Sequence, residues 1–142
     1  MTVVLFVDDD LTTGPSSHDS AVGYYFEALE EAGLKVVAQK SADGAVEAAA
    51  NNAADLIVLD LMMPPAEHHG AEADELETGL RLASELYDNV PETPIVVLTS
   101  IGWSKIHAGL KGIASVKRVL LKTEYPPSDL VAIVKGIIGD PS

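Results

Sequence analysis

The sequence predicts an α/β domain in which helices cover both faces of a parallel sheet. Short apolar runs alternate five times with segments of helical periodicity along the 142 residues. The runs are rich in β-branched residues, and Leu56-Ile57-Val58-Leu59 contains no alternating polar positions. Such continuous apolar runs are typical of strands that are covered on both faces. Right-handed crossovers between parallel strands then favour a doubly wound sheet.

Each element of this pattern has its own signal. The five expected strands are apolar and short, and they cover residues 3–7, 34–38, 56–59, 95–98 and 118–121. The first expected helix, residues 20–32, carries Val22, Phe26 and Leu29 on one stripe. Ser41 and Ser128 are expected to cap the second and fifth helices. The second then runs to residue 51, the third ends near residue 87, and a short fourth begins at residue 104.

Length and composition point to one domain over residues 1–142. There are 22 acidic residues against 9 Lys and Arg, and the net charge of −13 disfavours contact with nucleic acid or an anionic membrane. Cysteine is absent, which excludes disulfides and thiolate chemistry. The N-terminus lacks the pattern of a signal peptide, and no run approaches the ~20 apolar residues of a membrane span. We therefore expect a cytoplasmic protein.

Polar residues with reactive groups follow four of the five expected strands. Asp8-Asp9-Asp10 follows the first strand, Asp60 the third, Thr99-Ser100 the fourth and Lys122 the fifth. In a parallel sheet the carboxyl ends of the strands share one edge, where ligands bind. Each residue alone is common in polar turns, so the complete set at one edge is what indicates a site.

This set predicts phosphoryl chemistry supported by a divalent cation. Crowded carboxylates need a cation, and Mg²⁺ prefers oxygen ligands; Mn²⁺ could substitute for it. The expected ligands are Asp8, Asp9, Asp60 and the backbone carbonyl of Met62. A carboxylate can also act as a nucleophile and form an aspartyl phosphate. Thr99 and Lys122 would then neutralise the charge on the phosphoryl oxygens.

The segments around these residues resemble the receiver domains of two-component response regulators. Residues 55–64, Asp-Leu-Ile-Val-Leu-Asp-Leu-Met-Met-Pro, are similar to the phosphoacceptor segment of that family. Residues 4–10 resemble its first strand and acidic pair, and residues 94–100 its fourth strand with the switch threonine. Lys122 falls at the position of the lysine that pairs with the phosphoryl group. The resemblance covers nearly the whole chain.

This resemblance, closest to the chemotaxis type of regulator, implies a flavodoxin-like fold with strand order 2-1-3-4-5. It implies Mg²⁺-dependent transfer to Asp60 from a sensor histidine kinase, a phosphotransfer protein or a small donor such as acetyl phosphate. Asp8 and Asp9 would hold the metal, Thr99 would bond a phosphoryl oxygen, and Lys122 would pair with it. It also implies an unidentified downstream effector and a homodimer through the fourth helix, fifth strand and fifth helix, where Val119 and Ile106 would contribute.

Several positions depart from the family pattern. Thr123 follows Lys122 where the family has a proline, and Val119 stands at the aromatic switch position, so coupled switching of threonine and aromatic residue should be weak. Met62 and Ile101 are apolar where polar residues tend to assist the hydrolytic water, which predicts slow self-dephosphorylation.

Two expected loops, residues 11–18 and 64–77, look like insertions beside the site. We expect them to narrow access for phosphodonors or to shape the choice of partner. The second contains His68-His69, but no metal-ligand spacing is evident, and a solvated acidic loop is the simpler interpretation.

Two other functions fit parts of the sequence. Asp8-Asp9-Asp10-Leu11-Thr12 contains the Asp-x-Asp-x-Thr motif of haloacid-dehalogenase-type phosphatases, in which Asp8 would be the nucleophile and Asp10 the acid and base. That interpretation leaves the segment around Asp60 unexplained. A receiver-like module that docks without phosphorylation is the second alternative. An FMN-binding flavodoxin is disfavoured, because three aspartates after the first strand would repel the flavin phosphate.

Overall fold

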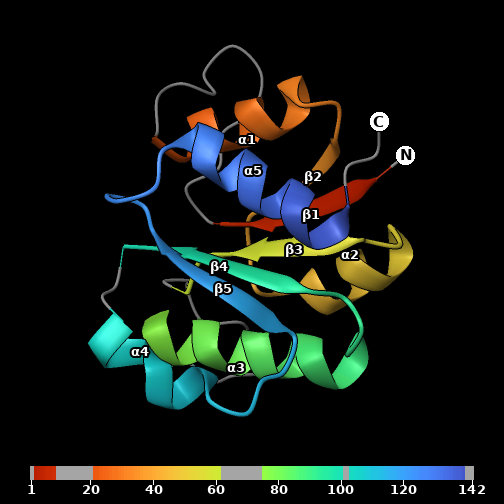
Figure 1. Ribbon diagram of the computed structural model, residues 1–142. Helices are drawn as coiled ribbons and strands as arrows, with labels where there is room; N and C mark the ends of the chain where they lie inside the picture. Colours follow the sequence, from red (N-terminus) through yellow and green to blue (C-terminus); the bar gives the residue numbers. More distant parts are fainter. Residues whose placement is uncertain (1, 9–20, 62–74, 101–102, 140–142) are drawn as a thin grey trace.

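The computed structural model describes residues 2–8, 21–61, 75–100 and 103–139 (Figure 1). Five strands and five helices alternate along these ranges. The strands are β1 (Val3–Val7), β2 (Lys35–Gln39), β3 (Leu56–Leu59), β4 (Ile95–Thr99) and β5 (Val116–Leu121). The helices are α1 (Ala21–Glu31), α2 (Ala45–Asn51), α3 (Glu75–Asn89), α4 (Trp103–Leu110) and α5 (Pro127–Ile138). The predicted alternation is confirmed.

All five strands pair in parallel, in the order β2-β1-β3-β4-β5. The flavodoxin-like strand order expected from the resemblance is therefore confirmed. From β1 the chain adds β2 on one side, and it then adds β3, β4 and β5 on the other side. The β1 and β3 strands therefore lie side by side at the switch point of strand order. This arrangement gathers the residues that follow β1 and β3 at one edge.

The helices form a layer on each face of the sheet, with α1 and α5 on one side and α2, α3 and α4 on the other (Figure 1). Alternate residues of each central strand serve opposite layers. In β1, Val4 and Phe6 pack with the α1–α5 layer, whereas Leu5 and Val7 pack with the other layer. The four residues of β3 are likewise fully buried. The continuous apolar runs in the sequence thus mark strands with two covered faces.

Two predicted helix caps are wrong. The α2 helix begins at Ala45 and its cap is Gly44, with a left-handed φ of 80°, while the Ser41 hydroxyl donates to the Asp43 carbonyl instead. A turn that needs positive φ at Gly44 therefore precedes the helix. The α5 helix begins at Pro127 and not after Ser128, because proline already has the φ of a first helical residue and has no N–H to leave unsatisfied.

The β1 and β3 strands have the predicted bounds, and most other boundaries lie within two residues of the predicted ones. The α3 helix begins at Glu75, inside the loop that was expected to run to residue 77. Among the helices of the described ranges, none is both long and apolar enough to cross a membrane.

Candidate functional site

Two aspartates sit side by side where β1 and β3 end. Asp8 follows β1 directly, and its N–H donates to the Gln39 carbonyl at 3.1 Å. Asp60 follows β3, and its N–H donates to the Val7 carbonyl at 2.9 Å. These bonds continue the parallel ladders one residue beyond the strands, so the backbone fixes both positions. Asp8 is fully buried and Asp60 is 4% exposed.

Lys122 connects the two carboxylates. Its Nζ lies 3.0 Å from Oδ2 of Asp8 and 3.3 Å from Oδ2 of Asp60. The backbone N–H of Lys122 donates to the Thr99 carbonyl at 2.9 Å, which anchors the first residue after β5 to the end of β4. Since β4 lies between β3 and β5, the long side chain spans the end of β4 to reach the aspartates.

The two aspartates stabilise the positive charge on Lys122. Burial by itself lowers the pKa of Lys122, but attraction by Asp60 and then Asp8, together with hydrogen bonds to both, raises the pKa above the ordinary lysine value. The ammonium form is thus held firmly. In the described part of the site, one ammonium group contacts two aspartate side chains.

Thr99 ends β4 and is fully buried. Its backbone pairs with Leu121, the residue before Lys122, so it lies between the Lys122 backbone and the end of β3. The structure thus brings together four of the predicted site residues.

Asp9, Asp10 and the carbonyl of Met62 lie outside the described residues, as do Ile101, His68 and both predicted insertions for most of their length.

The donor set suits a hard divalent cation. Within the described ranges no three His, Cys, Asp or Glu side chains cluster as metal ligands, and the site there contains two carboxylates. Mg²⁺ is usually held by one or two carboxylates together with waters, so Asp8 and Asp60 are sufficient in kind and number. Their shared contact with Lys122 involves Oδ2 of each, and both carboxylates carry a second oxygen.

The turn after β5 is held by a residue that the sequence did not reveal. Tyr25 in α1 is 4% exposed, and its hydroxyl donates to the carbonyls of Lys122, at 2.9 Å, and Tyr125. Burial raises the pKa of Tyr25, while the nearby Lys122 charge lowers it to a smaller extent. Tyr25 adjoins the predicted apolar stripe, but no sequence signal locates the partner of its hydroxyl.

A second residue was missed on the opposite face. Gly79 lies inside α3, where a Cβ would come within 1.9 Å of the carbonyl oxygen of Leu61. Leu61 follows Asp60 directly, so the absence of a side chain at Gly79 allows α3 to pack against the backbone beside the candidate acceptor. A signal did exist here, because glycine weakens a helix interior and usually has a packing reason there.

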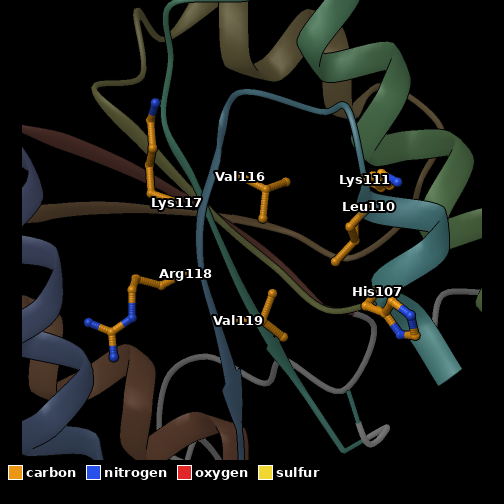
Figure 2. Close-up of a pocket in the computed structure, with 7 residues that line it drawn as sticks. All are labelled: His107, Leu110, Lys111, Val116, Lys117, Arg118 and Val119. Carbon is orange, nitrogen blue, oxygen red and sulfur yellow. The ribbon is translucent and has the colours of Figure 1, made fainter. Parts of the chain in front are cut away.

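A groove of about 620 Å³ lies between α4 and β5, on the face expected to mediate dimerisation (Figure 2). Leu110, Val116 and Val119 point toward it, whereas Lys117 and Arg118 extend away from its floor. A register shift between β4 and β5 at Ile95/Val96 explains why Val116 and Val119 share one side.

Ile106, predicted to contribute to this face, is fully buried in the core, so that expectation is wrong. Val119 remains a groove residue.

Comparisons with protein-family models and with curated proteins each found no match. Solved structures do match. The BeF₃-activated receiver domain of RstA from Klebsiella pneumoniae is 26% identical, with a TM-score of 0.72, 97% of this chain covered and 99% of that one. A CheY-like receiver domain from Methanospirillum hungatei is 17% identical, with a TM-score of 0.74 and coverages of 97% and 94%. This chain has the receiver-domain fold.

A further match is the response regulator TrrA from Thermotoga maritima in complex with Mg²⁺ and BeF, at 20% identity, a TM-score of 0.70 and coverages of 96% and 99%. The structural part of the predicted resemblance to receiver domains is therefore confirmed across nearly the whole chain. Two of these neighbours are thus described with beryllofluoride, one as BeF₃-activated and one in complex with Mg²⁺ and BeF.

Proposed function

We propose that residues 1–142 form one receiver domain that accepts a phosphoryl group on Asp60. The observation that carries this proposal is the contact of Lys122 with both Asp8 and Asp60. Asp8 has no exposed side-chain surface, whereas 5% of the Asp60 side chain is exposed, which favours Asp60 as the nucleophile.

In the proposed reaction a carboxylate oxygen of Asp60 attacks the phosphorus atom of the donor. A new O–P bond forms as the P–N bond of a phosphohistidine or the P–O bond of acetyl phosphate breaks, and the electron pair leaves with imidazole or acetate. Lys122 stays protonated and moves its hydrogen bond from Asp60 to a phosphoryl oxygen. The Thr99 hydroxyl donates to another phosphoryl oxygen.

Asp8 and Asp60 are the described residues that would hold Mg²⁺, with Asp9 and the Met62 carbonyl as the further ligands that the sequence predicts. A bound Mg²⁺ would neutralise phosphoryl charge and orient the transferring group. The receiver fold of the Mg²⁺ and BeF complex of TrrA supports this assignment. Asp8 also contacts Lys122, so it would bind both the ammonium group and Mg²⁺.

The partners we propose are a sensor histidine kinase or phosphotransfer protein as donor and a downstream effector, with a homodimer through α4, β5 and α5. The groove between α4 and β5 supports the last point, because it has an apolar floor formed by Leu110, Val116 and Val119. Lys111, Lys117 and Arg118 also border it. Three of the nine Lys and Arg residues therefore lie at one groove of a chain whose net charge is −13, which favours a partner surface that presents acidic residues to this groove.

Exposure to acetyl phosphate and Mg²⁺, followed by intact mass measurement, tests the proposed function. We expect one phosphoryl group per chain, located at Asp60 by borohydride reduction and peptide mapping. Asp60→Asn should abolish uptake, and Asp88→Asn, an exposed carboxamide substitution in α3, should leave it unchanged.

The same experiment separates the alternatives. A label on Asp8 would favour the haloacid-dehalogenase-type interpretation. No label in the presence of Mg²⁺, from acetyl phosphate or from a phosphorylated donor, would favour the interaction module.

A further inference from the structure

We propose that Tyr25 is a positioning residue that holds the β5–α5 turn and thereby keeps Lys122 over Asp8 and Asp60. This inference deepens the proposed function and rests on it. The turn has Thr123, and not a proline, after Lys122, so no proline ring constrains its backbone there. The Tyr25 hydroxyl provides a constraint in its place. It acts from α1, a helix that carries none of the other site residues.

The contacts of the hydroxyl identify its role. Tyr25 donates to the carbonyls of Lys122 and Tyr125, which are three residues apart and bracket the turn. One hydroxyl proton is shared between two acceptors, so both carbonyls must converge on the same point. The two contacts join residues 97 and 100 positions apart in sequence, so they fix the turn relative to α1.

The hydrogen bonds within the turn do not involve the two carbonyls that Tyr25 contacts. The N–H groups of Glu124 and Tyr125 both donate to the Leu121 carbonyl, at 3.0 and 3.1 Å. These bonds curl the chain after β5 but use neither the Lys122 nor the Tyr125 carbonyl. Thr123 and Glu124 are exposed, and they follow Lys122 without an intervening proline. Tyr25 therefore supplies the contact that orients the two remaining carbonyls.

Orientation of the Lys122 carbonyl matters for the ammonium group. The carbonyl and the side chain share one Cα, so rotation of the backbone after Lys122 moves the base of the side chain. That side chain must span the end of β4, and its Nζ meets two carboxylates at 3.0 and 3.3 Å. A displacement of the Cα has to be absorbed by the side-chain torsions of Lys122, which disturbs the geometry of these two contacts.

The hydroxyl is separable from the ring. The ring is buried in the core between the sheet and the α1–α5 layer, together with Phe26 and Leu29. Tyr25→Phe keeps this ring and removes only the donor, so packing is preserved. The matched control is Tyr87→Phe, which removes a hydroxyl from a partly buried tyrosine in α3, on the opposite face of the sheet.

A double-mutant cycle with Lys122→Ala distinguishes positioning from general stabilisation. We expect Tyr25→Phe to slow phosphoryl uptake from acetyl phosphate by about tenfold, below the ~100-fold that misplacing a reacting group by 1 Å can cost. In the Lys122→Ala background the same substitution should have no further effect, because no ammonium remains to be misplaced. Mg²⁺ affinity measured by calorimetry should change less than about twofold, since Asp8 and Asp60 are held by β1 and β3.

Equal slowing in both backgrounds, or no slowing in either, would overturn the inference. Amide hydrogen exchange supplies a readout that does not require phosphorylation. Exchange at Glu124 and Tyr125 should accelerate in Tyr25→Phe and not in Tyr87→Phe; unchanged exchange also overturns the inference. If the wild-type chain takes up no phosphoryl group but exchange is still faster in Tyr25→Phe, the proposed function is refuted and the anchoring of the turn by Tyr25 stays supported.

Discussion

Replacing Gly79 by alanine should both destabilise the domain and disturb the backbone at Leu61, directly after Asp60. A Cβ at residue 79 would lie 1.9 Å from the Leu61 oxygen, and real Cβ atoms essentially never approach a heavy atom within 3.0 Å. The contact must therefore open by about 1.1 Å. The atoms that block the Cβ are backbone atoms, so a change of side-chain rotamer cannot relieve the clash. Either α3 or the segment after Asp60 has to move.

Gly136→Ala is the matched control, because Gly136 lies in α5 and a Cβ there meets nothing within 4 Å. Both substitutions gain about 1 kcal/mol of helix propensity, so the difference between the two variants isolates the clash. Overpacking costs about 1–3 kcal/mol, and we expect the upper end because backbone must move. The free energy of unfolding of Gly79→Ala should therefore be about 3 kcal/mol below that of Gly136→Ala.

Urea denaturation monitored by circular dichroism measures this difference, and phosphoryl uptake by the same samples measures the effect on Asp60. Gly136→Ala should be slightly more stable than the wild type and should take up phosphoryl at the wild-type rate. A Gly79→Ala variant as stable as Gly136→Ala would refute the close packing of α3 on Leu61.

Three further predictions concern the charge cluster and the groove. Lys122→Ala should lower the free energy of unfolding by about 3 kcal/mol at neutral pH, because two buried carboxylates lose their cation. Because folding raises the pKa of Lys122, the contribution of its charge to the free energy of unfolding is complete below the ordinary lysine value of 10.5 and is lost as the pH rises through the folded-state pKa. Urea denaturation curves of the wild type and Lys122→Ala should therefore converge above pH 10.5. Phosphorylated Asp60 should persist well beyond seconds after removal of the donor, since Met62 and Ile101 are apolar; mass spectra that show loss of the label within seconds would contradict this. Val119→Asn should weaken the proposed homodimer by about tenfold in analytical ultracentrifugation, whereas an unchanged association constant would exclude Val119 from the interface.

The sequence predicted the sheet because its strands are buried on both faces. Their continuous apolar runs, as in β3, leave few other structures in which every residue is covered. It predicted Asp8, Asp60, Thr99 and Lys122 for a related reason. Residues that follow parallel strands converge on one edge whatever the details of the helices, so their proximity follows from topology alone.

The helix caps and the positioning contacts depend on geometry that the pattern does not encode. Ser41 is a good cap in composition, but the left-handed turn at Gly44 places the start of α2 beyond it. Tyr25 lies about 100 positions from the carbonyls that it binds, and a hydroxyl on a buried helix face has no preferred partner in sequence. The glycine at position 79 could have indicated that α3 packs closely against another part of the backbone, but not that this part is Leu61.

The residues that sequence analysis missed explain how the two helical layers support one site. Through Gly79, α3 packs on the residue after Asp60, and through Tyr25, α1 holds the turn that carries Lys122. Asp60 and Lys122 are thus positioned from opposite faces of the sheet. If Asp60 accepts a phosphoryl group as proposed, Lys122 exchanges its contact with Asp60 for one with the phosphoryl group, so the change occurs between the two segments that Gly79 and Tyr25 support. With Val119 in place of an aromatic switch residue, we expect displacement of the Leu61 segment and the β5–α5 turn to carry the signal, in preference to a rotamer change in β5.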